Sequence, residues 1–213
     1  MIHLQAHNLT RRYGSHTVLK DLTFEARCPV LGIAGANGSG KSTLLKCIAG
    51  LLKPNRGTIT WTVGGLQCVP SSLGSLVGYS APYVELYEGM TVSENLEFLR
   101  GVNRNPAPEN SAGFATLLER FHAAAYADKL YGELSTGQRQ RIKLAAACIH
   151  HPPLLCLDEP GSNLDENGRK MLRRAIGELA GENRMVLIAS NQPDELKMCH
   201  EIIQLDALFR QEI

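Results

Sequence analysis

A glycine-rich segment, Gly35-Ala36-Asn37-Gly38-Ser39-Gly40-Lys41-Ser42-Thr43, has the spacing of a phosphate-binding loop. Glycines let successive backbone N–H groups turn toward the β- and γ-phosphates of a nucleoside triphosphate, which a Cβ atom would obstruct. Lys41 then reaches the same phosphates, and the Ser42 hydroxyl is placed to bind Mg²⁺. The pattern predicts a nucleotide site whose candidate residues are Gly35, Asn37, Gly38, Ser39, Gly40, Lys41, Ser42 and Thr43.

The segments on either side of this loop have the patterns of a strand and a helix. Residues 30–34 form a short apolar run, and residues 43–50 have helical periodicity. We expect strand, loop and helix in this order, so that the positive end of the helix points at the phosphates. A glycine-rich surface turn is the simpler alternative, but it would leave the lysine without a role.

Two acidic residues, Asp158 and Glu159, follow a second apolar run at residues 154–157. A triphosphatase needs a carboxylate for its metal and a group that orients water. We expect Asp158 to hold Mg²⁺, directly or through a water, and Glu159 to polarise the attacking water. A solvated turn is the alternative for adjacent acids after a strand, and the phosphate loop upstream disfavours it.

The bulk composition is that of an ordinary globular chain. Its 213 residues are 44% hydrophobic and 20% charged, which suits one large domain and leaves no room for two complete nucleotide-binding domains. A net charge of +1 with scattered basic residues argues against a nucleic-acid partner. The N-terminus has no signal-peptide pattern and no apolar segment is long enough to span a membrane, so we expect a cytoplasmic chain.

The periodicity along the chain favours an α/β core with a helical insertion. Residues 91–147 have helical patterns, beginning with capping-box spacing between Thr91 and Glu94. Residues 103–110, rich in proline and asparagine, predict a loop. Residues 2–6 and 17–26 predict strands of a half-exposed antiparallel sheet. We therefore expect an α/β core at about 1–80 and 148–213, including an N-terminal antiparallel β-subdomain, with a helical subdomain at about 81–147.

A third motif, Leu134-Ser135-Thr136-Gly137-Gln138, lies between the phosphate loop and the acidic strand. With these motifs in this order, the chain resembles the ATP-binding subunits of ABC transporters, whose Leu-Ser-Gly-Gly-Gln signature has threonine here at Thr136. The resemblance extends to Ser162-Asn163-Leu164-Asp165, which matches the aspartate loop of the family. It spans nearly the whole chain and implies a single P-loop ABC-type ATPase domain that uses ATP and Mg²⁺.

The resemblance also implies partners. In the family, the signature of one subunit closes on the nucleotide held by the other, so Ser135, Gly137 and Gln138 would bind ATP across a homodimer or a paired ABC subunit. Such a pair drives a membrane-spanning subunit, which would place this chain on the inner face of the cell membrane. Tyr13 matches the aromatic residue that stacks on adenine; packing at a strand end is its alternative role.

Two positions depart from the family pattern. Pro82 stands where a glutamine contacts Mg²⁺ and water, and proline offers neither a ligand nor a donor. Either a water fills this position or the loop has a different register; Glu85 is the nearest carboxylate, but we do not assign it this role. Asn191 stands where a histidine contacts the γ-phosphate, and asparagine keeps a donor without a positive charge. We expect slowed ATP hydrolysis, with Glu159 and Asn191 as the catalytic residues.

Three functions remain open from the sequence. The first is a transporter ATPase subunit, in which Tyr83, Leu86, Tyr87 and Met90 either dock the membrane partner or form the small core of the helical part. The second is a slowly hydrolysing, nucleotide-gated regulatory module of the cell-division or cytochrome c maturation type. The two departures favour it, but Asp158 and Glu159 keep it below the first. The third, an iron–sulfur assembly ATPase, is disfavoured by the short chain. The compact length resembles the haem-exporter ATPase subunit.

Overall fold

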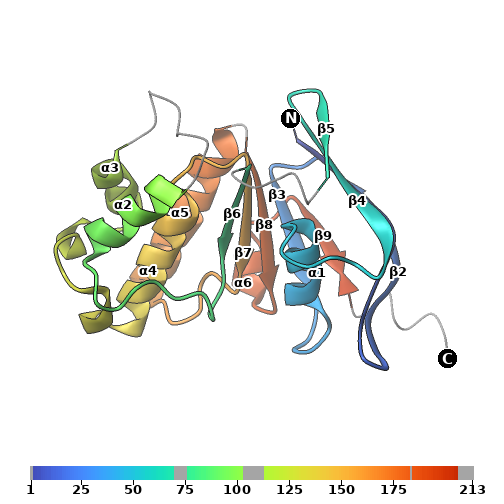
Figure 1. Ribbon diagram of the computed structural model, residues 1–213, viewed down its shortest axis with the longest axis horizontal. Coiled ribbons are helices and arrows are strands. Elements are labelled where there is room, and N and C mark those ends of the chain that lie inside the picture. Colours follow the sequence, from blue (N-terminus) through green and yellow to red (C-terminus); the bar gives the residue numbers. More distant parts are fainter. Residues whose placement is uncertain (1, 70–75, 103–112, 183, 206–213) are drawn as a thin grey trace.

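The computed structural model describes residues 2–69, 76–102, 113–182 and 184–205, and it arranges them in layers (Figure 1). An antiparallel sheet and a parallel sheet enclose one helix, and further helices cover the other face of the parallel sheet. This is the mixed α/β fold that the sequence predicts. The loop expected at residues 103–110 lies outside the described residues.

The antiparallel sheet is built mostly from the N-terminal part of the chain, as predicted. Its strand order is β2-β1-β4-β5, with bounds β1 His3–Tyr13, β2 His16–Ala26, β4 Arg56–Val63 and β5 Leu66–Cys68. Strand β1 is longer than the predicted strand at residues 2–6. The register shifts between Ala6 and Leu9, where Asn8 has a φ of 49°, and this irregularity interrupts the alternation that identifies a strand in the sequence.

The parallel sheet positions the candidate site. Its strand order is β6-β7-β8-β3-β9, with bounds β6 Val77–Ser80, β7 Leu154–Asp158, β8 Met185–Ser190, β3 Val30–Ala34 and β9 Glu201–Gln204. The three strands in the middle are buried along their whole length, and their side chains alternate between two hydrophobic cores. Because the strands are parallel, the phosphate loop, the acidic pair and Asn191 all follow carboxyl ends at the same edge.

Helix α1 (Lys41–Ile48) lies between the two sheets (Figure 1). Its buried residues Leu44, Leu45 and Ile48 join a core that includes Trp61 of the antiparallel sheet. The Trp61 indole donates a hydrogen bond to the carbonyl oxygen of Ile48, at 3.3 Å. This contact fixes the helix that carries the phosphate loop at its N-terminus.

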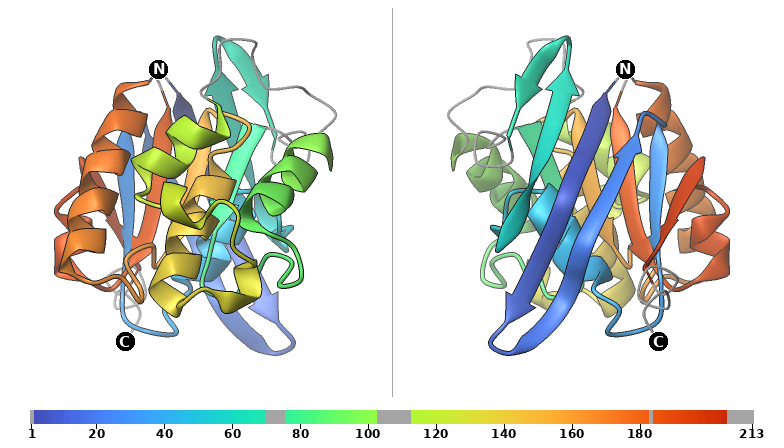
Figure 2. Two further views of the ribbon diagram at one scale, coloured as in Figure 1. Left: turned by 90° about the vertical axis from the view of Figure 1, so that its left-hand side faces the viewer. Right: turned by 90° about the vertical axis from the view of Figure 1, so that its right-hand side faces the viewer.

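The remaining helices cover the opposite face of the parallel sheet (Figure 2). Their bounds are α2 Val92–Val102, α3 Phe114–Arg120, α4 Thr136–Ala147, α5 Glu166–Gly181 and α6 Pro193–Leu196. The predicted capping box of α2 is confirmed, since the Thr91 N–H donates to Glu94 Oε2 at 2.7 Å and the Glu94 N–H donates to Thr91 Oγ1 at 3.1 Å. In the part of the chain that the structure describes, no helix is both long and apolar enough to cross a bilayer.

Candidate nucleotide site

A pocket of about 460 Å³ opens over the phosphate loop between β3 and α1. Gly40 is the N-cap of α1 with a φ of 98°, and a Cβ atom there would lie 2.9 Å from Val18 Cγ1. Both the backbone angle and the contact require glycine at this position. The structure thus brings most of the predicted loop residues to one cavity, lined by Val18, Asn37, Gly38, Gly40, Lys41, Ser42, Thr43 and Glu159.

Lys41 is buried under the loop and interacts with its backbone. The ammonium group donates to the carbonyl oxygens of Gly35 at 2.8 Å and Ala36 at 3.0 Å. An ammonium group has three N–H donors, so one remains for a phosphate oxygen while the loop keeps the other two. Gly35, predicted as a nucleotide-binding residue, therefore acts through its carbonyl group by holding Lys41. Ser39, also predicted, is absent from the pocket lining as described, and its buried hydroxyl has no hydrogen-bond partner among the described residues.

Asp158 ends β7 and is 2% exposed. Burial raises the pKa of its carboxyl group, while the Ser42 hydroxyl and the ammonium groups of Lys46 and Lys41 oppose the rise. Its Oδ1 atom has no hydrogen-bond partner among the described residues. A buried carboxylate oxygen without a donor, beside a serine hydroxyl, is an oxygen donor set that fits Mg²⁺.

Glu159 lines the same pocket from a strained backbone. Its φ is 47°, in the left-handed region that few residues other than glycine adopt. Its N–H donates to the carbonyl oxygen of Ala189 at 2.8 Å, and its Oε2 accepts from the Ser190 hydroxyl at 3.3 Å. Burial raises the pKa of Glu159, and the nearby Lys41 opposes the rise. The surrounding structure thus holds one carboxylate at the edge of the phosphate pocket.

Asn191 follows β8 directly and reaches the phosphate loop. Its side-chain Nδ2 donates to Asn37 Oδ1 at 2.9 Å. The predicted catalytic asparagine is therefore close to the pocket, although it does not itself line the cavity as described.

The signature residues are held at the N-terminus of α4. The Gln138 N–H donates to Ser135 Oγ at 3.4 Å, and the Ser135 N–H donates to Gln138 Oε1 at 2.9 Å, which completes a capping box. A Cβ atom on Gly137 would lie 2.8 Å from the carbonyl oxygen of Asn163, so glycine is needed there for close packing. Figure 1 shows α4 and α1 on opposite faces of the parallel sheet. Within the described residues, the chain does not bring its own signature to its own phosphate pocket.

Tyr13 lies at the end of β1, in the hairpin whose second strand contributes Val18 to the pocket. Tyr13 as a whole is 47% exposed, and the Arg11 guanidinium carbon lies 4.8 Å from its ring centroid. The tyrosine is therefore not packed in a core at the strand end. It does not line the cavity as described, so a stacked adenine would have to lie beyond the phosphate pocket.

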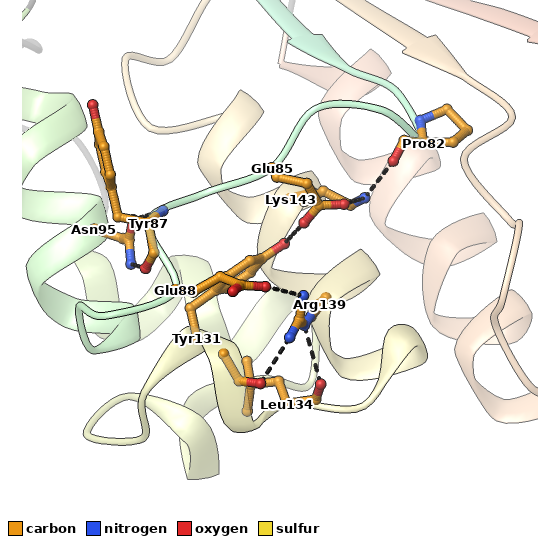
Figure 3. A network of polar contacts seen from close by, with 10 residues as sticks. Pro82, Glu85, Tyr87, Glu88, Asn95, Tyr131, Leu134, Arg139 and Lys143 are labelled. Atoms are coloured by element: carbon orange, nitrogen blue, oxygen red, sulfur yellow. Dashed lines mark hydrogen bonds and ion pairs between the residues drawn. The ribbon is translucent and has the colours of Figure 1, made fainter.

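The segment that follows β6 is tied to α4 by a polar network (Figure 3). The Lys143 ammonium donates to the carbonyl oxygen of Pro82 at 3.0 Å and pairs with Glu85 Oε1 at 3.2 Å. The other carboxylate oxygen of Glu85 accepts from the Tyr131 hydroxyl at 2.8 Å. The Glu85 carboxylate, the nearest one to Pro82 in the sequence, is thus used in binding Tyr131 and Lys143.

Arg139 extends this network toward the signature (Figure 3). Its guanidinium group pairs with Glu88 at 2.9 Å and donates to the carbonyl oxygens of Leu134 at 3.1 Å and Gly132 at 2.7 Å. The sequence analysis missed this network, because its members lie up to 61 residues apart and share no local pattern. As a result, hydrogen bonds and ion pairs join the loop following β6 to the signature helix.

The candidate docking residues differ in their exposure. Tyr83 and Tyr87 are more than half exposed, whereas Leu86 packs against the helix-side core. The Tyr83 hydroxyl hydrogen-bonds that of Tyr79, and the Tyr87 ring contacts Phe98 edge-on at 5.2 Å between centroids. Met90 is partly buried, so Leu86 and Met90 contribute to packing, while the two exposed tyrosines leave the docking role a prediction.

Comparison with known proteins agrees with this geometry. Residues 19–162 match the sequence model of the family described as ABC transporter. The chain is 34% identical over 179 residues to the ABC transporter ATP-binding protein YbhF of Escherichia coli (strain K12), covering 83% of this chain and 31% of that protein. It thus spans about a third of YbhF.

Two further comparisons cover more of the other chain. The chain is 32% identical over 204 residues to the cytochrome c biogenesis ATP-binding export protein CcmA of Rhizobium etli, covering 94% of each chain. The solved dimeric structure of MJ0796, a bacterial ABC transporter cassette, has the same fold, with a TM-score of 0.80 and 23% identity over 94% of this chain and 93% of that one. The chain therefore belongs to the ABC transporter family, as one of its ATP-binding cassettes.

Proposed function

We propose that this chain binds and hydrolyses Mg-ATP as a subunit of an ABC transporter, in a dimer that holds two ATP molecules. The proposal rests on one observation. The phosphate loop, Asp158 and Glu159 lie at the same edge of the parallel sheet, while the signature lies elsewhere. One chain supplies half of each site, so a second chain has to supply the rest.

The residues of the pocket then have distinct roles. Lys41 and the loop N–H groups bind the phosphates, Ser42 and Asp158 hold Mg²⁺, and Glu159 orients and polarises the attacking water. When bound, Mg²⁺ neutralises charge on the phosphates and so stabilises the charge that develops during hydrolysis. The buried and unpartnered Oδ1 of Asp158 supports its assignment to the metal.

The dimer is supported by the arrangement of the signature helix. The N-terminus of α4, capped by Ser135, can bind an anion through its backbone N–H groups, and none of its residues lines the phosphate pocket as described. In the proposed dimer the signature residues Ser135, Gly137 and Gln138 contact the ATP held by the other chain. A homodimer or a paired ABC subunit would both satisfy this requirement.

The proposed membrane partner docks on the helical part, residues 81–147. The exposed rings of Tyr83, Tyr87 and Phe98 supply apolar surface there. This partner would hold the chain at the inner face of the cell membrane. CcmA carries the description of an export protein, which supports a transport role for the present chain. The transported substrate would contact the partner, so its identity does not follow from these residues.

We propose that hydrolysis is slow. Asn191 retains a hydrogen-bond donor but has no positive charge, and Pro82 has no side-chain donor or ligand. Removing a single donor from a preorganised anion site costs roughly 2.7 to 4 kcal/mol of transition-state stabilisation. A side chain that keeps a donor, as Asn191 does, should therefore cost less than this. The same two residues favour a second candidate function, a nucleotide-gated regulatory module with little transport.

The Glu159→Gln variant tests the main proposal. Loss of the base should stop hydrolysis while ATP stays bound, so the variant should form a dimer with Mg-ATP in light scattering, whereas the parent protein returns to monomer as ATP is consumed. Glu166→Gln, an exposed glutamate at the start of α5, is the matched control and should behave like the parent. Parental ATP turnover by Glu159→Gln, or a monomer with bound ATP, would refute the assignment. Stimulation of turnover by source membranes would favour transport over regulation.

A further inference from the structure

Glu195 is a buried acid that has no role in the nucleotide chemistry described so far. It lies in α6 just beyond β8 and is 5% exposed. Its Oε1 accepts the N–H of Gly161 at 3.1 Å. Its Oε2 is buried and has no hydrogen-bond partner among the described residues. A carboxylate that is buried with only part of its hydrogen bonding satisfied is costly, so its retention calls for an explanation.

The Ser190 hydroxyl binds the catalytic acid and also lies near Glu195. Ser190 Oγ donates to Glu159 Oε2 at 3.3 Å and accepts the N–H of Gln192 at 3.0 Å. A hydroxyl group has one proton and two lone pairs. Its proton is used for Glu159 and one lone pair for Gln192, so the other lone pair can accept one more donor.

An ionised Glu195 cannot be that donor, because a carboxylate only accepts hydrogen bonds. Burial raises the pKa of Glu195; the Ser190 hydroxyl beside it opposes the rise, and the nearby Glu159 carboxylate adds to it. The Gly161 N–H and the Arg169 guanidinium also oppose it, and the pKa is raised overall. The neutral acid offers the missing O–H donor and leaves no unpaired buried charge.

We propose that Glu195 is a positioning residue for Glu159. As a neutral acid it donates to the Ser190 hydroxyl, whose own proton is then directed at the Glu159 carboxylate, while its other oxygen holds the Gly161 N–H. The catalytic glutamate is thereby fixed at its side chain through Ser190 and at its following backbone through Gly161.

The geometry of Gly161 and Glu159 shows why such fixing matters. A Cβ atom on Gly161 would lie 2.3 Å from Glu195 Oε1, so the carboxyl group sits directly against this backbone. Glu159 itself keeps a φ of 47°, a conformation that persists only where neighbours hold it in place. Because a shift of about 1 Å in a catalytic group can reduce the rate by roughly 100-fold, the loss of this support should be visible in turnover.

Steady-state ATP turnover of two variants is the main test, and it rests on the proposed function. Glu195→Ala removes both contacts and should lower kcat by about 10- to 100-fold, with the KM for ATP within about twofold of the parent, since Glu195 does not touch the nucleotide pocket as described. Glu195→Gln has nearly the same shape, is always neutral, and can accept from Gly161 and donate to Ser190. It should keep kcat within about threefold of the parent. Asp194→Ala, an exposed neighbour paired with Lys197, is the matched control and should match the parent.

A double-mutant cycle shows whether Glu195 acts through the catalytic residue. In a Glu159→Gln background, Glu195→Ala should cause no further loss of the residual rate, and Ser190→Ala should reduce the effect of Glu195→Ala in the parent. If the rate losses of Glu195→Ala and Glu159→Gln were additive, Glu195 would act on stability alone. Parental kcat in Glu195→Ala, or equal losses in Glu195→Ala and Glu195→Gln, would overturn the proposal.

Thermal unfolding gives a readout that does not depend on ATP turnover. If Glu195 is neutral in the folded protein, Glu195→Gln should have a Tm equal to or above that of the parent at pH 7. A Tm several degrees below the parent would mean that the folded protein needs the charged form, and the proposal would fail. A parent protein without ATPase activity would instead refute the proposed function, and this measurement would still decide the state of Glu195.

Discussion

Asn191 and Asn37 are joined by a hydrogen bond of 2.9 Å between Nδ2 and Oδ1, although they lie 154 residues apart in the chain. The bond connects the end of β8 with the phosphate loop. An amide can make this link, but it cannot supply a positive charge to a γ-phosphate. The contact therefore identifies the end of the pocket where the family resemblance predicts a histidine and this chain has an asparagine.

Asn191→His should raise the ATP turnover number, by up to about tenfold. A histidine can keep a donor toward the loop and also become a cation near the γ-phosphate, which strengthens electrostatic stabilisation of the transition state. The measurement is kcat under saturating Mg-ATP. Asn191→Ala, which removes the donor, should lower kcat. An unchanged kcat in both variants would mean that residue 191 does not contact the γ-phosphate.

Tyr13→Ala should weaken ATP binding without affecting folding. Stacking of a base on an aromatic ring contributes about 1 to 3 kcal/mol, and Tyr13 is 47% exposed, so little core packing is lost. Equilibrium titration with a fluorescent ATP analogue measures the change, and the Tm reports folding. Tyr13→Phe keeps the aromatic face and should bind ATP like the parent. Unchanged affinity in Tyr13→Ala would remove this residue from the adenine site.

Gly40→Ala should both destabilise the protein and abolish tight ATP binding. The new Cβ atom would lie 2.9 Å from Val18 Cγ1 in a backbone with a φ of 98°, so the phosphate loop would have to shift. Gly14→Ala is the matched control, because Gly14 also has a positive φ, 58°, but has nothing within 4 Å of the added carbon. The control should lose about 1 kcal/mol of unfolding free energy and keep its ATP affinity. Equal loss of affinity in both variants would contradict the role of the close contact.

The sequence predicted the elements whose signals are local. The apolar run at residues 30–34 and the capping box at Thr91 and Glu94 both appear in the structure as expected. These features depend on neighbouring residues, and their periodicity or spacing is visible in a single chain. The parallel strands also bring the phosphate loop and the acidic pair together, as the order of motifs suggested.

Contacts between distant segments could not be predicted in this way. The Glu85–Lys143 pair and the Glu195–Gly161 hydrogen bond join residues that no spacing rule relates. Gly137 was predicted only for nucleotide binding, yet its close approach to Asn163 gives a packing reason for the same residue. Tertiary packing decides such contacts, and a single sequence does not display it.

The Glu85–Lys143 pair should make stability depend on pH. Burial raises the pKa of Glu85, but hydrogen bonds from Tyr131 and Lys143 outweigh it, so the pKa is lowered overall. A lowered pKa in the folded state adds stability at pH values above the ordinary glutamate pKa of about 4.3, and this stability is lost as the pH falls through the folded-state pKa.

Glu85→Gln should therefore reduce the unfolding free energy by about 1 kcal/mol at pH 7, a modest effect because the side chain is 51% exposed. The difference should shrink in urea unfolding toward pH 3, whereas Glu97→Gln, exposed on α2, should match the parent at both pH values. A constant difference across this range would mean that the carboxylate charge does not stabilise the contact.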